Sequence, residues 1–147
     1  WLGSVDCPPM KRADAEQIVA FLLAAQRGTF YFQDYANPTN RGGVTGTLTV
    51  TTATANGTTL TFGGATGSFA VGDWLQISTS LYKVVQSNSS SSVDVFPALR
   101  KSYAGGTSIT YANAKGVFRL ASPSTEWAIG EASIYGVGFA IIEDVES

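Results

Sequence analysis

Two carboxylates, Glu126 and Glu131, bracket Trp127 and have the residue types that glycoside hydrolysis requires. That reaction uses two carboxyl groups about 5–9 Å apart on either side of a sugar. Exposed carboxylates at strand ends are common, however, and the sequence shows no recognisable pattern for a substrate cleft. We therefore expect no catalytic residue and a protein that is not an enzyme, and we keep a small glycosidase using this pair as the weakest alternative.

The composition removes the commonest catalytic and metal-binding groups. The 147 residues include no histidine, which is the usual general base, the usual partner of a Ser or Cys nucleophile and the commonest metal ligand. Cys7 is the only cysteine, so an intrachain disulfide and a zinc site built from cysteines are both excluded. Asp34, Asp73 and Asp94 lack the spacing of a calcium loop, and we expect them to cap turns or pair with Arg or Lys. The sequence predicts neither a metal site nor a cofactor site.

Three aromatic side chains are candidates for stacking on a glycan: Trp74, Tyr82 and Trp127. Trp74 and Tyr82 fall on neighbouring predicted strands, where core or cross-strand packing is the stronger interpretation. The glycine-rich run Gly63–Ser68 has no lysine after its last glycine, so it reads as a turn and not as a phosphate loop.

The charge balance limits the classes of partner that the protein is expected to bind. Only 14% of residues are charged, the net charge is −2 and 44% are hydrophobic. Low charge on a Thr/Ser-rich surface suits a protein that contacts other proteins widely, and it equally suits an ordinary β-rich domain. The negative balance argues against binding to a nucleic-acid backbone. No run approaches the ~20 apolar residues of a membrane span, so we expect no membrane partner.

One helix is predicted at Met10–Arg27, because this is the only segment with helical periodicity. Its apolar stripe comprises Ala15, Ile18, Leu22 and Ala25, with Phe21 beside them. Acidic residues begin the helix, Arg27 ends it and Gly28 is predicted as a left-handed cap. Strands are predicted before it at Trp1–Val5 and after it at Thr29–Phe32, in one sheet that the helix covers.

The middle of the chain is strongly β, with many short runs of Thr, Val and aromatic residues. Strands are predicted at Gly46–Thr52, Thr58–Phe62, Trp74–Ile77, Leu81–Val85, Val93–Phe96 and Ser108–Tyr111. Asn56-Gly57 is typical of a two-residue hairpin, Gln86–Ser92 is predicted to be an exposed loop, and Pro97 ends its strand.

Three closing strands are predicted at Phe118–Ala121, Thr125–Ile129 and Ile134–Glu143. The last is long and apolar, as expected for the sheet under the helix. We therefore predict a mainly β fold with one packed helix (α+β). Residues 1–43 plus 116–147 form one unit, and 44–115 form an inserted small β-barrel or sandwich, because glycine-marked polar segments flank the insertion.

The order of motifs resembles that of the minor tail proteins of tailed bacteriophages, of the distal-tail or tail-hub type. The motifs are Pro8-Pro9-Met10, the amphipathic helix, GTFYF, GDWLQIS, LYKVV, FPALR, AKGVFRLAS and the closing strand. The resemblance implies a split β-barrel or sandwich of tail-tube type with an inserted domain. Because the family carries further N-terminal strands that pair with Trp1–Val5, we expect a larger N-terminal part ahead of Trp1.

The same resemblance implies a structural virion protein with no chemistry of its own. Copies would form a ring, as a hexamer, between the tail tube and the tail-tip proteins of the virion, after assembly in the host cytoplasm. The alternative is a glycan-binding β module at the tail tip that assists host attachment through Trp74, Tyr82 or Trp127.

Overall fold

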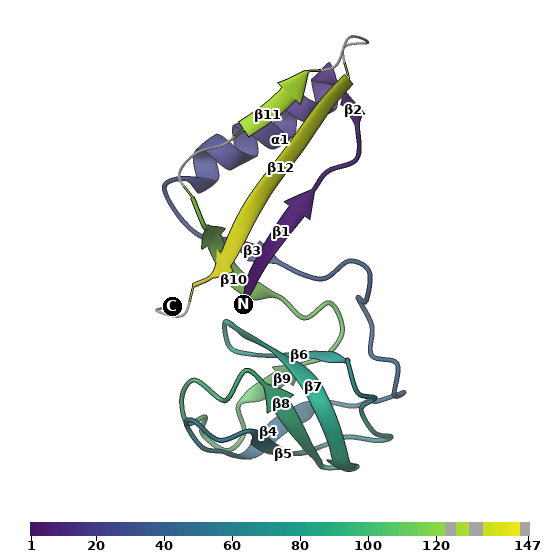
Figure 1. Cartoon of the computed structure of the whole chain (residues 1–147). Coiled ribbons are helices and arrows are strands. Elements are labelled where there is room, and N and C mark those ends of the chain that lie inside the picture. The colour runs from purple at the N-terminus through teal and green to yellow at the C-terminus, as the bar shows by residue number, and fades with distance from the viewer. Residues whose placement is uncertain (123–125, 130–133, 145–147) are drawn as a thin grey trace. The chain divides into compact units, whose positions relative to one another are not determined.

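The computed structural model describes residues 1–122, 126–129 and 134–144. The fold is mainly β with one helix, and the chain divides into two compact units (Figure 1). The sheet unit comprises Trp1–Tyr31 and Val117–Glu146, and the barrel unit comprises Phe32–Gly116. The first boundary differs from the sequence estimate at Gly43, because side chains and backbone of residues 34–44 are hydrogen-bonded to the barrel.

The sheet unit is built around one long strand. Its elements are β1 (Leu2–Asp6), β2 (Met10–Lys11), α1 (Arg12–Ala25), β3 (Phe30–Phe32), β10 (Gly116–Leu120), β11 (Glu126–Ile129) and β12 (Ile134–Glu143). The strand order is β1-β12-β10-β3, and β2 and β11 also pair with β12 (Figure 1). β1 and β3 therefore share a sheet, as predicted, but they lie at its opposite ends and do not pair with each other.

The helix is shorter than the predicted segment Met10–Arg27. It begins at Arg12, because Met10 and Lys11 pair with β12 as strand β2, and it ends at Ala25. Gly28 does not have the predicted left-handed conformation, since its φ is outside the positive range. The helix instead closes with right-handed Gln26, whose N–H donates to the carbonyl of Leu22.

One face of α1 packs on β12 and buries Ala15, Leu22 and Ala25 of the predicted stripe. Phe21 is not part of this core: it is 44% exposed and contacts Phe30 edge-on, with ring centroids 5.2 Å apart. Burial of a side chain such as Leu22 stabilises the sheet unit by about 1.5–3 kcal/mol.

The barrel unit is a closed six-stranded barrel, so the predicted inserted β structure is a barrel. Its strands, β4 (Leu48–Ala53), β5 (Thr59–Gly63), β6 (Trp74–Ile77), β7 (Ser80–Ser89), β8 (Ser92–Phe96) and β9 (Ser108–Thr110), close in the order β4-β5-β8-β7-β6-β9. Alternate residues point inward and form one apolar core, which includes Leu48, Leu60, Leu75, Tyr82, Val93 and Leu99.

Two predicted connections differ in the barrel. Gln86–Ser89 is exposed, as expected, but it extends β7 instead of forming a loop, because it pairs with β8 across two register shifts. The Asn56-Gly57 turn lies in a longer connection between Ala53 and Thr59, with Asn56 at φ 63°. Both segments keep the polar side chains that their sequence indicates at the surface.

Candidate functional site

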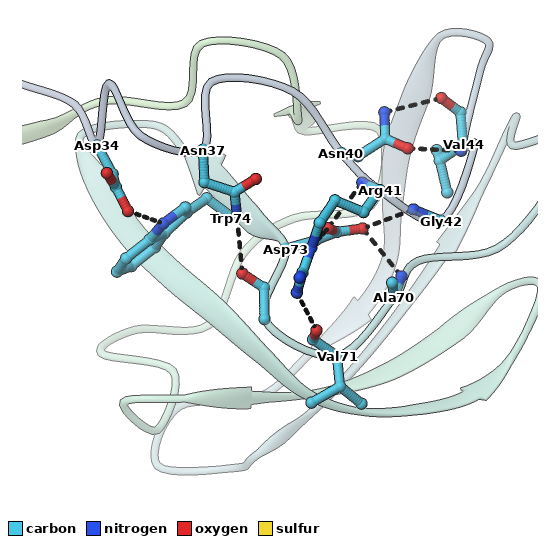
Figure 2. A network of polar contacts seen from close by, with 11 residues as sticks. Asp34, Asn37, Asn40, Arg41, Gly42, Val44, Ala70, Val71, Asp73 and Trp74 are labelled. Atoms are coloured by element: carbon cyan, nitrogen blue, oxygen red, sulfur yellow. Dashed lines mark hydrogen bonds and ion pairs between the residues drawn. The ribbon is translucent and has the colours of Figure 1, made fainter.

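A buried carboxylate, Asp73, lies at the entrance to β6 and is the centre of a polar network (Figure 2). Its Oδ1 accepts a hydrogen bond from the backbone N–H of Arg41 at 2.8 Å. Its Oδ2 accepts from Ala70 at 2.9 Å and from Gly42 at 3.2 Å. The Arg41 Nε lies 3.7 Å from Oδ1. The prediction that Asp73 caps a turn or pairs with a basic residue is confirmed. Its two oxygens hold the backbone of Arg41 and Gly42 against the turn before β6, and this arrangement is here called the clip.

Other bonds extend the clip along the segment that leads into the barrel (Figure 2). The Arg41 Nη2 donates to the carbonyl of Val71 at 2.7 Å, and the Asn37 Nδ2 donates to Gly72 at 3.2 Å. Asn40 bonds both backbone groups of Val44. These bonds tie residues 34–44 to the turn before β6.

Close backbone packing completes the clip at Gly42. A Cβ at this position would collide with the backbone of Ser68–Ala70, so only glycine fits. The glycine-rich run at 63–68 works in the same way: Gly64 and Gly67 have φ near +80°, and no phosphate loop is formed. The polar cluster therefore fastens the segment that enters the barrel to the turn before β6.

Trp74 is the candidate stacking residue that lies at the barrel surface. Its Nε1 donates to the Asp34 Oδ2 at 3.1 Å, and the Lys83 Nζ lies 4.5 Å from the centre of its ring (Figure 2 shows the Asp34 bond). Asp34 is positioned in turn by the N–H of Ala36 at 3.0 Å. The indole is thus half-buried and held in one orientation, beside a cation.

Tyr82 cannot serve as a glycan platform, because the structure buries it completely. Leu75 lies opposite Tyr82 while Trp74 lies opposite Lys83, so the two aromatic candidates point to opposite faces of the barrel wall. The Tyr82 hydroxyl is 2.9 Å from that of Tyr103 and accepts a bond from the Arg100 N–H at 3.3 Å. The core interpretation of Tyr82 is therefore correct.

The remaining candidates lie partly or wholly outside the described residues. The backbone of Trp127 pairs with Val137, but its side chain and that of Glu126 are outside the description, as is all of Glu131. The proposed carboxylate pair therefore has no described geometry.

The other reactive groups that the structure describes have ordinary surroundings. Burial, followed by the charge of Asp6, raises the pKa of the Cys7 thiol, which makes it a poor nucleophile at neutral pH. Within the described ranges, no three His, Cys, Asp or Glu side chains gather as metal ligands do. In the same part of the chain, no helix has the length and apolar character needed to cross a membrane.

Phe96 is a surface aromatic that the sequence reasoning missed. It lies opposite Lys83, which lies opposite Trp74, so the three form one outward-facing line across β8, β7 and β6, here called the aromatic row. Phe96 is 56% exposed, and Val71 and Val85 are also exposed. The alternation in VDVF carried this signal, because inward Val93 and Val95 require Phe96 to face outward.

The sheet unit has an open edge at β1. Glu143 N–H donates to the carbonyl of Trp1, and Cys7 N–H donates to the carbonyl of Val137, so the odd-numbered residues of this strand bond β12. The backbone groups of Leu2, Ser4 and Asp6 therefore point away from β12. Within the described residues, no other strand pairs with β1. This row of donors and acceptors can receive a further strand.

On the sheet face opposite α1, the middle of β12 presents small residues. Along β12, Val137 and Ile141 are buried toward the helix, whereas Gly136, Gly138 and Ala140 alternate with them and are exposed. A close approach by another molecule is sterically possible there.

In the comparisons with known proteins, no protein-family model and no curated protein matched this chain.

Proposed function

We propose that this protein is a structural, non-enzymatic subunit of a bacteriophage tail, in which copies join through the edges of the sheet unit into a ring at the distal end of the tail. The observation that carries the proposal is the open backbone edge of β1, with Leu2, Ser4 and Asp6 directed outward. The motif resemblance in the sequence supplies the tail context.

The composition of β1 supports strand addition. Edge strands of free-standing proteins are commonly protected by lysine, proline or a bulge. Leu2–Asp6 contains neither lysine nor proline, its register to β12 is continuous, and Leu2 is 73% exposed. An edge of this kind favours a partner strand over solvent. We assign that partner strand to a neighbouring copy, in place of the N-terminal strands that the family resemblance implies for Trp1–Val5.

The strand order supports a ring. The order begins at β1 and finishes at β3, so the two edges are different surfaces at opposite ends of one sheet. A contact between the β1 edge of one copy and the opposite edge of the next is heterologous. Such contacts build a ring when the rotation between copies closes and a filament when it does not, and the family resemblance favours the ring. Six copies, a tail-tube and tail-tip neighbourhood and a place in the virion follow from the family resemblance.

A glycan-binding module at the tail tip is the second candidate, and Trp74 is the observation that favours it. The indole is at the surface, and its orientation is fixed by Asp34. The apolar face of such a ring can stack against the apolar face of a sugar. Loss of polysaccharide binding in Trp74→Ala, with unchanged assembly, is the result expected from this candidate.

The ring is tested by changing one outward backbone group. Ser4→Pro removes an N–H that points away from β12, so the ladder within the sheet unit is retained while strand addition is blocked. Ser4→Thr is the matched control, because it keeps that N–H. We expect rings of the full-length protein to be lost in Ser4→Pro and kept in Ser4→Thr, as measured by mass photometry and particle imaging.

Two results would contradict the proposal. One is a wild-type protein that stays monomeric at high micromolar concentration and never enters virions. The other is hydrolysis of a host glycan that disappears in Glu126→Gln, since a structural subunit has no such activity.

A further inference from the structure

The two edge strands of the sheet unit carry its most exposed large hydrophobic side chains. Among the described residues of this unit, Leu2 of β1 is 73% exposed and Tyr31 of β3 is 66% exposed, ahead of Leu23 and Phe21 of α1. β1 and β3 lie at opposite ends of the strand order (Figure 1). A single exposed apolar side chain is ordinary on a protein surface. These two, however, stand at the two places where the sheet lacks a neighbouring strand.

Leu2 projects from the sheet face opposite α1. It lies across from Ile142 of β12, and alternation along β12 puts Ile142 on the other face from Ile141, which is buried toward the helix. The Leu2 side chain therefore has an apolar neighbour on its inner side, at Ile142. On its outer side, no strand of the described chain pairs with β1.

Tyr31 projects from the same face of the sheet at the other edge. Its neighbour Phe30 contacts Phe21 of α1, with ring centroids 5.2 Å apart, so Phe30 is on the helix side. Alternation along β3 then directs Tyr31 to the opposite face. Pairing the β1 edge of one copy with the β3 edge of another therefore brings Leu2 and Tyr31 together.

The two edges also fit each other on the helix side of the sheet. On β1 this side carries Gly3, where an added Cβ would meet only the Ile141 side chain within 4 Å, at 3.6 Å or more. On β3 it carries Phe30 and Phe32, which alternate with Tyr31. Large side chains on one edge thus face a small residue on the other, an arrangement that close packing favours.

Pairing between two copies of β1 is a poorer match. An antiparallel pair centred on Ser4 uses all three outward residues of β1 and sets Leu2 opposite Asp6, so that an apolar side chain neighbours a carboxylate. Such a contact is isologous and stops at a dimer. Backbone bonds alone do not select between this dimer and a β1–β3 contact, whereas the side chains do.

We propose that β3 of one copy is the strand that receives β1 of the next copy, and that packing of Leu2 beside Tyr31 selects this partner. The inference rests on the proposed function, because it names the strand and the side chains of the ring contact. Both side chains lie opposite α1, so the helices of all copies are on one side of a continuous sheet.

The test cross-links single-cysteine variants of the full-length protein with a bis-maleimide of about 8 Å reach, the spacing of cross-strand neighbours. Cys7, the only cysteine in the 147 residues, is replaced by serine. Leu2→Cys and Tyr31→Cys are prepared separately and then assembled together. On a denaturing gel we expect cross-linked dimers from the mixture and none from either variant alone.

Matched controls separate this pair from general apolar contact. Leu23 is an exposed apolar residue of the same unit, on the helix. Leu23→Cys mixed with Leu2→Cys should give no cross-link. Leu2→Ser and Tyr31→Ser should each raise the dissociation constant of assembly about fivefold, and the double variant should be no weaker than either, because contacting residues are coupled. Leu23→Ser should leave assembly unchanged.

The outcomes separate this inference from the proposed function. Rings without cross-links between Leu2→Cys and Tyr31→Cys, or additive effects of the two serine variants, would overturn the assignment of β3 and leave the ring standing. Equal cross-linking with Leu23→Cys would overturn it too, because β1 would then have no fixed partner. Cross-linking of Leu2→Cys to itself, or a wild type that is monomeric under all conditions, would overturn both.

Discussion

The barrel unit and the sheet unit differ in how they treat the edges of their sheets. In the barrel, the six strands close on themselves, so every strand has two neighbours and side chains from all six strands fill the core. In the sheet unit, the strand order has two ends, and one helix covers one face through a stripe of three buried residues. Closure removes sheet edges, whereas an open sheet keeps them.

This difference indicates where stability and interaction each reside. In the barrel the strand pairing closes on itself, and the Asp73 clip fastens the segment that enters it. The sheet unit presents unpaired backbone on β1 and small residues on one face, which are the properties of a part that is completed by neighbours.

The largest effect is expected from Leu22→Asp, because this side chain is fully buried between α1 and the sheet. Burying an unpaired carboxylate in place of leucine should cost at least about 4 kcal/mol. We expect the sheet unit to unfold while the barrel keeps its amide signals in two-dimensional NMR. A folded variant with an unchanged melting temperature would show that the helix is peripheral. Ala20→Asp, on the exposed side of the helix, is the control.

A reciprocal effect is expected from Leu60→Ala in the barrel core. This side chain is also fully buried, and large-to-small changes of this kind cost about 2–5 kcal/mol. Thermal unfolding is followed by fluorescence in a Trp1→Phe, Trp127→Phe background, in which Trp74 is the remaining tryptophan. It should report a lower barrel transition, while circular dichroism shows the sheet-unit transition unmoved. Equal shifts of both transitions would show that the two units unfold as one.

A smaller effect is expected from Asp73→Asn. The substitution keeps the shape but replaces one acceptor oxygen with an amide group that faces backbone donors, which should cost about 1–3 kcal/mol. Urea unfolding should show the loss in the barrel transition. Asp94→Asn, whose carboxylate bonds Thr59 and Asn88 at the surface, should change stability by less than about 0.5 kcal/mol. Equal losses in the two variants would contradict the assignment of a clip.

The smallest effect concerns pH. Burial raises the pKa of Tyr103, and its hydroxyl contacts that of Tyr82. Above about pH 10 the unfolded chain releases this proton while the folded barrel retains it, so stability present below pH 10 is lost as pH rises. The fall in melting temperature between pH 9 and pH 11 should be smaller in Tyr103→Phe than in the wild type. An identical fall would show that Tyr103 does not couple to folding.

The elements of this fold could be predicted from local pattern, whereas their partners could not. The period of Ala15, Leu22 and Ala25 indicated the helix and its buried face, and alternation around Val93 indicated β8. The inward position of Tyr82 depends on register with Leu75, which is set across strands. The start of α1 at Arg12 depends on the pairing of Met10 with Tyr135, far along the chain.

The candidate sites show the same limit. Asp73 was expected to cap a turn, but its donors at Arg41 and Gly42 are more than thirty residues away, beyond any local pattern. Phe96 could have been identified, because alternation fixes its face. Its alignment with Trp74 required the order of three strands.

The most direct test of the account is an image reconstruction of the full-length protein after assembly, at a resolution that separates strands. We expect a closed ring in which the outward groups of Leu2, Ser4 and Asp6 bond a strand of the neighbouring copy, while each barrel stays closed on itself. A ring whose contacts leave β1 exposed to solvent, or particles that contain only monomers, would contradict it.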